Sequence, residues 1–262
     1  MIQPPVYGPF HWLNTRGDRT LVTNPLKLVD GMYRMDMEAF RRDVKGCKVF
    51  ILCNPHNPGG VVWTEEELKE VAEICYEEGV LVFSDEIHAD LTLPPHKHRP
   101  FAMVSEKARM NSVTFMSPSK AFNMPGLTAS HALIFNPKLR RKFHTYLESS
   151  ELDLGHVFAF LAVEAAYSHG TEWLDQCLAY IQGNIDYVDE FTKQHTPKIK
   201  VIRPQASFLV WLDCREMGLS QDALNDFFVD KAHLALNNGV AFGEEGEGFM
   251  RLNVASPRSV LE

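Results

Sequence analysis

Residues 48–83 read KVFILCNPHNPGGVVWTEEELKEVAEICYEEGVLVF. The apolar runs at the two ends, KVFILC and VLVF, have the length of buried strands, and the cluster NPHNPGG after the first run is typical of a turn. Thr64, with Glu67 three residues later, predicts a capping box at the start of a helix, and Gly79 is placed to end that helix. This order predicts a βαβ unit. Because both strands are apolar throughout, we expect a parallel sheet covered on both faces.

The sheet is expected to continue beyond this unit. Two more apolar runs, at 112–116 and 131–135, predict further strands. Pro137 opens a basic helical pattern, and longer helical patterns occupy 157–168 and 172–193. The predicted fold class is therefore α/β, a mostly parallel sheet with helices on both faces.

The chain changes character after Pro197. Residues 201–213 predict a strand pair or a bent strand, and Ser220 is expected to cap a helix over 220–232. A last strand is predicted over 249–255. These elements indicate part of a smaller α+β domain.

Two domains are therefore predicted: a large one over residues 1–185 and a partial small one over 186–262. The transition falls within the long helical pattern, and no flexible linker separates the two parts. The first residues lead directly into Pro4-Pro5, and the final SPRSVLE begins a helical pattern and stops. Both ends predict a fragment, with the large domain lacking its N-terminal part.

Composition excludes several classes of protein. The 262 residues include 45% hydrophobic and 23% charged side chains, which excludes a mostly disordered chain. The formal net charge of −8 argues against a nucleic-acid binder. No apolar run approaches the roughly 20 residues that span a membrane, and the N-terminus has no secretory-signal pattern. The five cysteines include no C-x-x-C pair, so we expect reduced thiols in a cytoplasmic protein.

Polar residues gather at the carboxyl ends of the apolar runs. In open α/β sheets, ligands bind beyond these strand ends, so the polar residues there predict one shared site. They are Asn54 and Asn57 after the first strand; Asp85, Glu86 and His88 after the second; and Ser117, Ser119 and Lys120 after the third.

Each of these residues also has an ordinary structural explanation when it is taken singly. Asp85 could be a turn residue, Asn57 a turn former between prolines, and Lys120 a solvated charge. Arg251, within the last apolar strand, is harder to explain because a buried arginine needs an anionic partner. Taken together and in this order, the residues favour a functional site.

The set fits the needs of pyridoxal phosphate. This cofactor requires a lysine amine for a Schiff base, a carboxylate at its pyridine nitrogen, and hydroxyls or backbone N–H groups for its phosphate. An arginine is required to hold the carboxylate of an amino-acid substrate in a two-bond fork.

Four stretches carry a family resemblance. They are NPHNPGG (54–60), SDEIHADL (84–91), SPSKAFN (117–123) and RLNVA (251–255), and in this order they resemble the fold-type I, aspartate-aminotransferase-like pyridoxal-phosphate enzymes. The histidines His56 and His88, Trp63, and the segment GFMRLN resemble more specifically the MalY/PatB branch of cystathionine β-lyases, also called cysteine-S-conjugate β-lyases. The resemblance covers essentially the whole chain.

The resemblance implies a role for each matching residue. Lys120 would form the Schiff base, Asp85 would bind the pyridine nitrogen, and Asn57 would bond the ring's phenolic oxygen, with His88 close to that oxygen. Ser117 and Ser119 fall in the phosphate-binding stretch, and Ser117 is the better match. Tyr7 matches the aromatic residue that stacks on the ring, and Arg251 matches the arginine for the substrate carboxylate.

The sequence also departs from the family pattern. The family's N-terminal glycine-rich phosphate-binding turn and the C-terminal helix of its small domain have no counterpart, which puts the activity of this chain in question. Thr128 stands where many aminotransferases place an arginine on the phosphate.

The function implied for the intact enzyme is cleavage of cystathionine or a related cysteine S-conjugate to a thiol, pyruvate and ammonia. An aminotransferase of the same superfamily, a non-catalytic regulatory relative and an inactive fragment stay open as alternatives. The family implies a homodimer; no nucleic acid, membrane or metal partner is expected.

Two further segments are interpreted as purely structural. The stretch PPHKHRP, with His96 and His98, predicts an exposed loop. The pairs Phe158 with Phe160 and Phe227 with Phe228 predict core residues.

Overall fold

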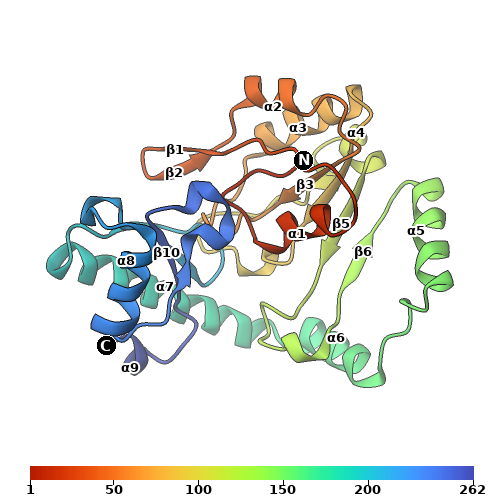
Figure 1. Ribbon diagram of the computed structural model, residues 1–262. Coiled ribbons are helices and arrows are strands. Elements are labelled where there is room, and N and C mark those ends of the chain that lie inside the picture. Colours follow the sequence, from red (N-terminus) through yellow and green to blue (C-terminus); the bar gives the residue numbers. More distant parts are fainter.

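A computed structural model describes residues 1–262, apart from the side chains of residues 14 and 15. One of its two four-stranded sheets has the order β3-β4-β5-β6, and Figure 1 labels β3, β5 and β6 of this sheet. Strands β3 (Val49–Cys53), β4 (Leu81–Asp85) and β5 (Ser112–Met116) are parallel, and β6 (His131–Leu133) pairs antiparallel with β5. The α/β fold class and the mostly parallel sheet are confirmed.

Helices lie on both faces of this sheet because the strands alternate two apolar sets. Phe50 and Leu52 belong to one buried cluster with the inner face of α3 (Glu65–Glu77) and with Ala108 of α4 (Glu106–Met110). Ile51 and Cys53 point the other way and pack in a second cluster with residues of α1 (Pro9–Thr15), while α5 (Pro137–Ser149) places Phe143 6.2 Å from Phe115 of β5. This two-period alternation follows from the pleat of a strand.

The predicted capping box starts α3. The Thr64 side chain accepts the Glu67 backbone N–H, and the Glu67 carboxylate accepts the Thr64 N–H. Gly79 follows the helix with φ of 66°, a left-handed conformation that glycine adopts without a steric penalty. Both of these predicted helix ends are confirmed.

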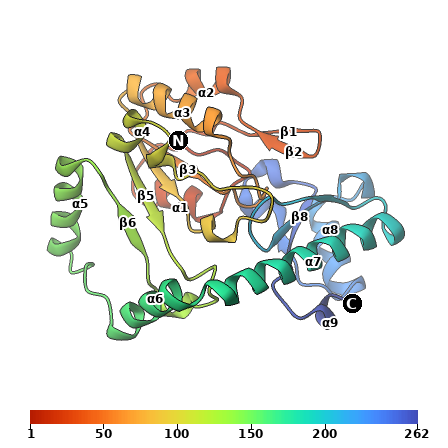
Figure 2. The same cartoon turned by 180° about the vertical axis from the view of Figure 1, so that it is seen from behind.

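A long helix joins the two halves of the molecule. After α6 (Val157–His169), α7 (Thr171–His195) runs along the back of the molecule beneath both sheets (Figure 2). The predicted division between residues 185 and 186 falls within α7, and it stays a prediction.

The C-terminal half is built on an antiparallel sheet with the order β7-β8-β10-β9. Its strands are β7 (Lys200–Ile202), β8 (Leu209–Asp213), β9 (Asn237–Asn238) and β10 (Phe249–Asn253). The segment 201–213 is thus a strand pair. The helix expected over 220–232 is shorter and less regular: α8 (Gln221–Asp226), capped by Ser220, continues as a π-helical turn over Phe227–Lys231.

Short elements complete the fold. They are the hairpin β1 (Lys27–Val29) and β2 (Met32–Arg34), α2 (Met37–Asp43) and α9 (Arg258–Leu261). The hairpin ties the two halves together, since Tyr33 of β2 accepts a hydrogen bond from the indole N–H of Trp211 in β8 at 3.1 Å. Trp211 in turn stacks on Phe249 with ring centroids 5.2 Å apart.

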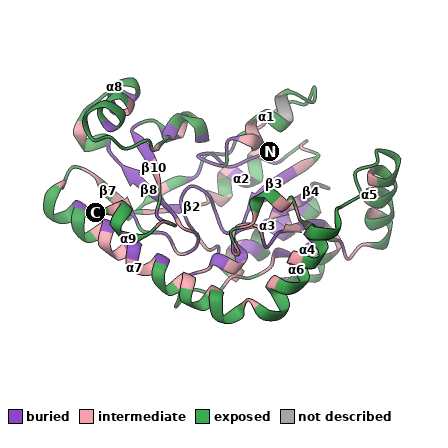
Figure 3. Ribbon diagram, turned by 90° about the horizontal axis from the view of Figure 1, so that it is seen from below, coloured by how far each residue is buried: buried purple, intermediate pink, exposed green. Residues whose placement is uncertain are grey.

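The surface departs from expectation at α6. Phe158 and Phe160 are 69% and 63% exposed, and Phe227 is at the surface as well, so of the four phenylalanines predicted to be core only Phe228 is buried. Figure 3 shows α5 and α6 as largely exposed helices. The predicted helix is present, but the apolar residues of α6 run around the whole helix, and most of them, unlike Ala159, are not buried by the described part of the chain.

Two further findings concern the whole chain. All five cysteines are free thiols. Among the residues that the structure describes, no helix is long and apolar enough to cross a membrane.

Candidate active site

A cavity of about 180 Å³ lies at the carboxyl ends of the parallel strands. The expected convergence of Asn57, Asp85 and Lys120 is found here, although the three follow different strands. The lining residues are Tyr7, Cys53, Asn57, Asp85, Ile87, His88, Lys120, Phe208, Leu209, Arg251 and Asn253. Six of the eight predicted site residues are therefore in one cavity.

Lys120 reaches the cavity from the turn after β5. Pro118 accepts the Phe122 N–H at 2.9 Å, and Ser119 accepts the Met124 N–H at 3.0 Å, so the chain folds back immediately after the strand. Lys120 is partly buried and makes no ion pair within the described part of the chain. Its amine is therefore not held by a carboxylate.

Asp85 is the last residue of β4, and its backbone carbonyl accepts the Asn54 N–H at 2.9 Å. Burial, with a smaller contribution from the charge of the neighbouring Glu86, raises the pKa of the Asp85 carboxyl to about 6. The Ile87 N–H, 3.2 Å from the carboxylate, and the charge of Lys120 act in the opposite direction. A cationic group bound in the cavity would favour the ionised form.

Asn57 lies in a turn that is hydrogen-bonded to the C-terminal half of the chain. The Gly60 carbonyl accepts the N–H groups of Gln205 and Ala206 at 2.8 and 3.2 Å. Gly60 has φ of 67°, and a Cβ there would lie 2.4 Å from that of Pro204, so only glycine allows this approach. The turn thereby brings Asn57 to Arg251, whose Nη1 donates to the Asn57 Oδ1 at 2.9 Å.

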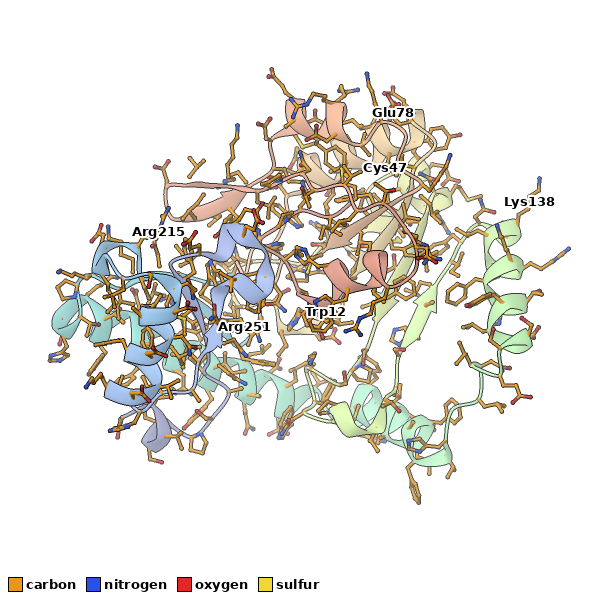
Figure 4. All side chains as sticks on the ribbon, in the orientation of Figure 1. Trp12, Cys47, Glu78, Lys138, Arg215 and Arg251 are labelled. Atoms are coloured by element: carbon orange, nitrogen blue, oxygen red, sulfur yellow. The ribbon has the colours of Figure 1, made fainter. Side chains whose placement is uncertain are left out.

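Arg251 is the cationic wall of the cavity, and it lies near the middle of the molecule where the C-terminal half meets the N-terminal segment (Figure 4). Its Nη2 donates to Asn237 Oδ1 at 2.8 Å, and the guanidinium carbon lies 4.6 Å from the centre of the Phe242 ring. Burial lowers the pKa of Arg251 to about 10, and its Nε is buried without a partner. No carboxylate of the described side chains forms a salt bridge with it, which removes the competing interpretation of a structural ion pair.

His88 lines the same cavity as a neutral imidazole. Burial, together with the positive charges of Lys120 and Arg251, lowers the pKa of His88 to about 3. Its ring lies edge-on to Phe208, and its Nδ1 is buried without a hydrogen-bond partner. A neutral ring nitrogen of this kind can donate to, or accept from, a ligand oxygen.

The two predicted phosphate residues lie beside the cavity. The Ser117 hydroxyl donates to the Ala129 carbonyl at 2.6 Å and accepts the Ser119 N–H at 3.1 Å, and the two hydroxyls are 2.8 Å apart. Ser119 lines a larger neighbouring cavity of about 460 Å³, which also contacts Lys120. Thr128, just before Ala129, has φ of 48°.

Of the lining and supporting residues that escaped the sequence analysis, four carry a thiol, an aromatic ring or an amide. Cys53 is buried and borders the cavity, where burial raises the pKa of its thiol. Phe208 and Asn253 line both cavities, and Asn237 binds Arg251 from outside them. Only Asn253 carried a sequence signal, because it belongs to the RLN stretch.

The expectation of an exposed loop at PPHKHRP is wrong for one histidine. His98 is 10% exposed, and its Nε2 lies 2.7 Å from the carboxylate of the buried Glu86. That carboxylate also accepts the Ser84 hydroxyl at 2.7 Å and the Phe101 N–H at 2.9 Å. His96 is exposed as expected. The described residues contain no cluster suited to a metal ion.

Comparison with known proteins gives the chain its family. Residues 5–262 match the family described as aminotransferase class I and II. The chain belongs to this family. It is 42% identical over 264 residues to cystathionine β-lyase PatB of Bacillus subtilis (strain 168) and 35% identical over 266 residues to protein MalY of Escherichia coli (strain K12), in both cases over 100% of the chain.

A solved structure of this family gives the same result for the fold. Cystalysin of Treponema denticola, which contains a pyridoxal 5'-phosphate cofactor, superposes with a TM-score of 0.97 at 32% identity over 99% of the chain. The chain spans 68% of PatB, 67% of MalY and 66% of the cystalysin chain, about two thirds of each relative.

The side chains of the cavity fit the cofactor that the family uses. The fit rests on unsatisfied groups: His88 Nδ1 and Arg251 Nε are buried and lack partners, and Lys120 is free of any ion pair. The other polar groups match the rest of the cofactor. The Asp85 carboxyl suits a basic ring nitrogen, the Asn57 amide suits a phenolic oxygen, and the hydroxyls of Ser117 and Ser119 suit a phosphate.

Proposed function

We propose that the intact enzyme is a pyridoxal-phosphate-dependent carbon–sulfur β-lyase that cleaves cystathionine or a related cysteine S-conjugate to a thiol, pyruvate and ammonia. The observation that carries the proposal is the pairing of an amine and an unneutralised guanidinium, Lys120 and Arg251, in one cavity with Asp85 and Asn57. The lyase reaction is supported over others of the family by relatives that are named cystathionine β-lyase, PatB among them.

The cofactor would be held by residues from both halves of the chain. Lys120 would bind it covalently, Asp85 would hold the proton on its ring nitrogen, and Asn57 with His88 would bond the phenolic oxygen. Tyr7 would cover the ring. When bound, the cofactor supplies an electron sink that stabilises negative charge at the substrate Cα.

Ser117 and Ser119 are proposed to bind the phosphate. Their hydroxyls lie 2.8 Å apart at the turn that follows β5. Each can donate to a phosphate oxygen when its hydroxyl proton rotates away from its present acceptor.

The chain's own residues then account for the reaction. Arg251 binds the substrate carboxylate in a planar fork and so fixes the orientation of Cα. The Lys120 amine, when free, would remove the proton from Cα as a general base. The electron pair left at Cα expels the thiolate from Cβ. Water then hydrolyses the three-carbon product to pyruvate and ammonia.

Pyruvate release tests this proposal. We expect the holoenzyme to form pyruvate from cystathionine with no keto acid present, and Lys120→Ala to form none. Activity only when a keto-acid acceptor is added would contradict the lyase and identify an aminotransferase. A protein that binds pyridoxal phosphate but does neither would be a non-catalytic relative.

We also propose a homodimer located in the cytoplasm. Support for the dimer comes from α6, an apolar helix with Ala159 as its one buried residue among those described. Helices that are apolar all round are usually buried. Five free thiols are consistent with a reducing compartment.

Light scattering tests the assembly. Joint replacement of Phe158 and Phe160 by serine is expected to convert the dimer to a monomer, whereas replacement of Tyr76, another exposed aromatic residue, on α3, by serine is not. A wild-type protein that is monomeric at micromolar concentration would contradict the proposal.

A further inference from the structure

The guanidinium of Arg251 is held by two carboxamides and by no carboxylate. Asn57 accepts from Nη1 at 2.9 Å, and Asn237 accepts from Nη2 at 2.8 Å. A guanidinium has five N–H donors, so these two bonds leave three free, among them the buried Nε–H. The side chain is thereby fixed in place while a two-bond fork is still available.

The position of Asn237 is determined by strand pairing, and Asn237 does not line the cavity. It lies in β9, directly opposite Arg251 in the antiparallel register with β10, so the two side chains meet across neighbouring strands. Asn238, next to it, is paired with Met250 instead, and its side chain accepts the N–H of Val240. The strand register therefore determines that Asn237, and not the neighbouring Asn238, contacts Arg251.

We propose that Asn237 is a positioning and specificity-determining residue: its neutral amide orients Arg251 toward an α-carboxylate without neutralising the charge that binds it. The inference rests on the proposed function, because it assigns the carboxylate of an amino-acid substrate to Arg251. A carboxylate at position 237 would satisfy the same hydrogen bond, but it would compete with the substrate for the guanidinium.

The decisive variant is Asn237→Asp, which has nearly the same shape and adds one negative charge. We expect KM for cystathionine to rise about tenfold while kcat changes less than about threefold, because the added charge opposes ground-state and transition-state binding alike. Asn237→Ala removes the orienting amide without adding charge, so its KM is expected to rise clearly but by less than that of Asn237→Asp, and an unchanged KM would refute the positioning role.

A pair of non-reacting ligands separates charge competition from general damage. Calorimetry on the holoenzyme would compare methylthiopropanoate, which has a carboxylate and no amine, with methylthiopropylamine, which has the amine and no carboxylate. Asn237→Asp should weaken binding of the acid about tenfold and leave binding of the amine within about twofold.

The outcomes distinguish this inference from the proposed function. If the acid and the amine weaken equally, or if the acid binds Asn237→Asp as tightly as wild type, the role of Asn237 is refuted even where pyruvate is formed. If the acid alone weakens and no variant forms pyruvate, Asn237 has the proposed role and the lyase reaction is wrong.

Discussion

Replacing Asp85 with asparagine should stabilise the cofactor-free protein near pH 8. Burial raises the Asp85 pKa from an ordinary value of 3.8 to about 6, so the folded chain resists ionisation of this carboxyl. At about 1.4 kcal/mol per pH unit, the ionised form costs about 3 kcal/mol of folding free energy. Asparagine keeps the acceptor for the Ile87 N–H, 3.2 Å away, and removes the buried charge.

The sign of the pH dependence follows from the raised pKa. A carboxyl whose pKa is higher in the folded state contributes stability that is fully present below its unfolded pKa, about 3.8, and is lost as the pH rises through about 6. Near pH 4 both proteins carry a neutral group at position 85, and their stabilities should be about equal. The gap should open between about pH 4 and pH 7 and stay constant above.

Urea unfolding of the cofactor-free chain at several pH values measures this gap. Asp230→Asn is a matched control, since it removes an exposed carboxylate and should change the unfolding free energy little at any of these pH values. A variant that is less stable than wild type near pH 8, or a gap that does not vary with pH, would refute the reasoning. With cofactor bound the order should reverse, because the variant loses the partner of the ring nitrogen.

Three further predictions concern neighbouring groups. Cofactor affinity should fall by up to about tenfold per pH unit below about pH 6, because the free protein then binds a proton at Asp85; fluorescence titration measures it, and a flat profile from pH 5 to 7 would contradict it. Arg251→Lys should raise KM at least about tenfold while the cofactor absorbance and the melting temperature stay near wild type; loss of all three together would point to a structural role. His98→Ala should lower the unfolding free energy by about 1–3 kcal/mol, since it removes one hydrogen bond from the buried Glu86, whereas the exposed His96→Ala should lower it by less than about 0.5 kcal/mol; equal effects would exclude the buried pair.

Local signals in the sequence were sufficient to predict most of the sheet β3-β4-β5-β6. Strand β5 was predicted at its observed bounds, and the capping box of α3 lies where Thr64 and Glu67 placed it, because these features depend on neighbours within a few residues. The same locality brought the residues after β3, β4 and β5 to one cavity, since parallel strands end at a common edge. Arg251 was singled out as an arginine within an apolar strand, and the resemblance added its role and Tyr7, neither of which follows from the strand ends.

What the sequence did not predict depends on contacts between distant segments. The irregular end of the helix after Ser220 and the exposure of Phe158 and Phe160 follow from what lies beside those segments, and a helical period is silent about that. His98 was misjudged for the same reason: its partner Glu86 is 12 residues away on another element, and the prolines around the histidine indicated only a loop.

The contact between the two halves of the molecule could not be predicted from local sequence patterns. The proposed function depends on it, because it brings Asn57 and Arg251 together. Asn57 and Arg251 are 194 residues apart in the chain, yet their 2.9 Å hydrogen bond unites the proposed cofactor-binding and carboxylate-binding residues. That distance is kept by a backbone contact, in which Gly60 receives two N–H groups from the segment after Pro204 and leaves no room for a Cβ. Since the contact is made by backbone, the relative position of the two halves does not depend on the side chains that bind substrate. The substrate-binding side chains can therefore keep single polar atoms without a partner, as His88 Nδ1 and Arg251 Nε do among the described residues, and these atoms remain available to a ligand.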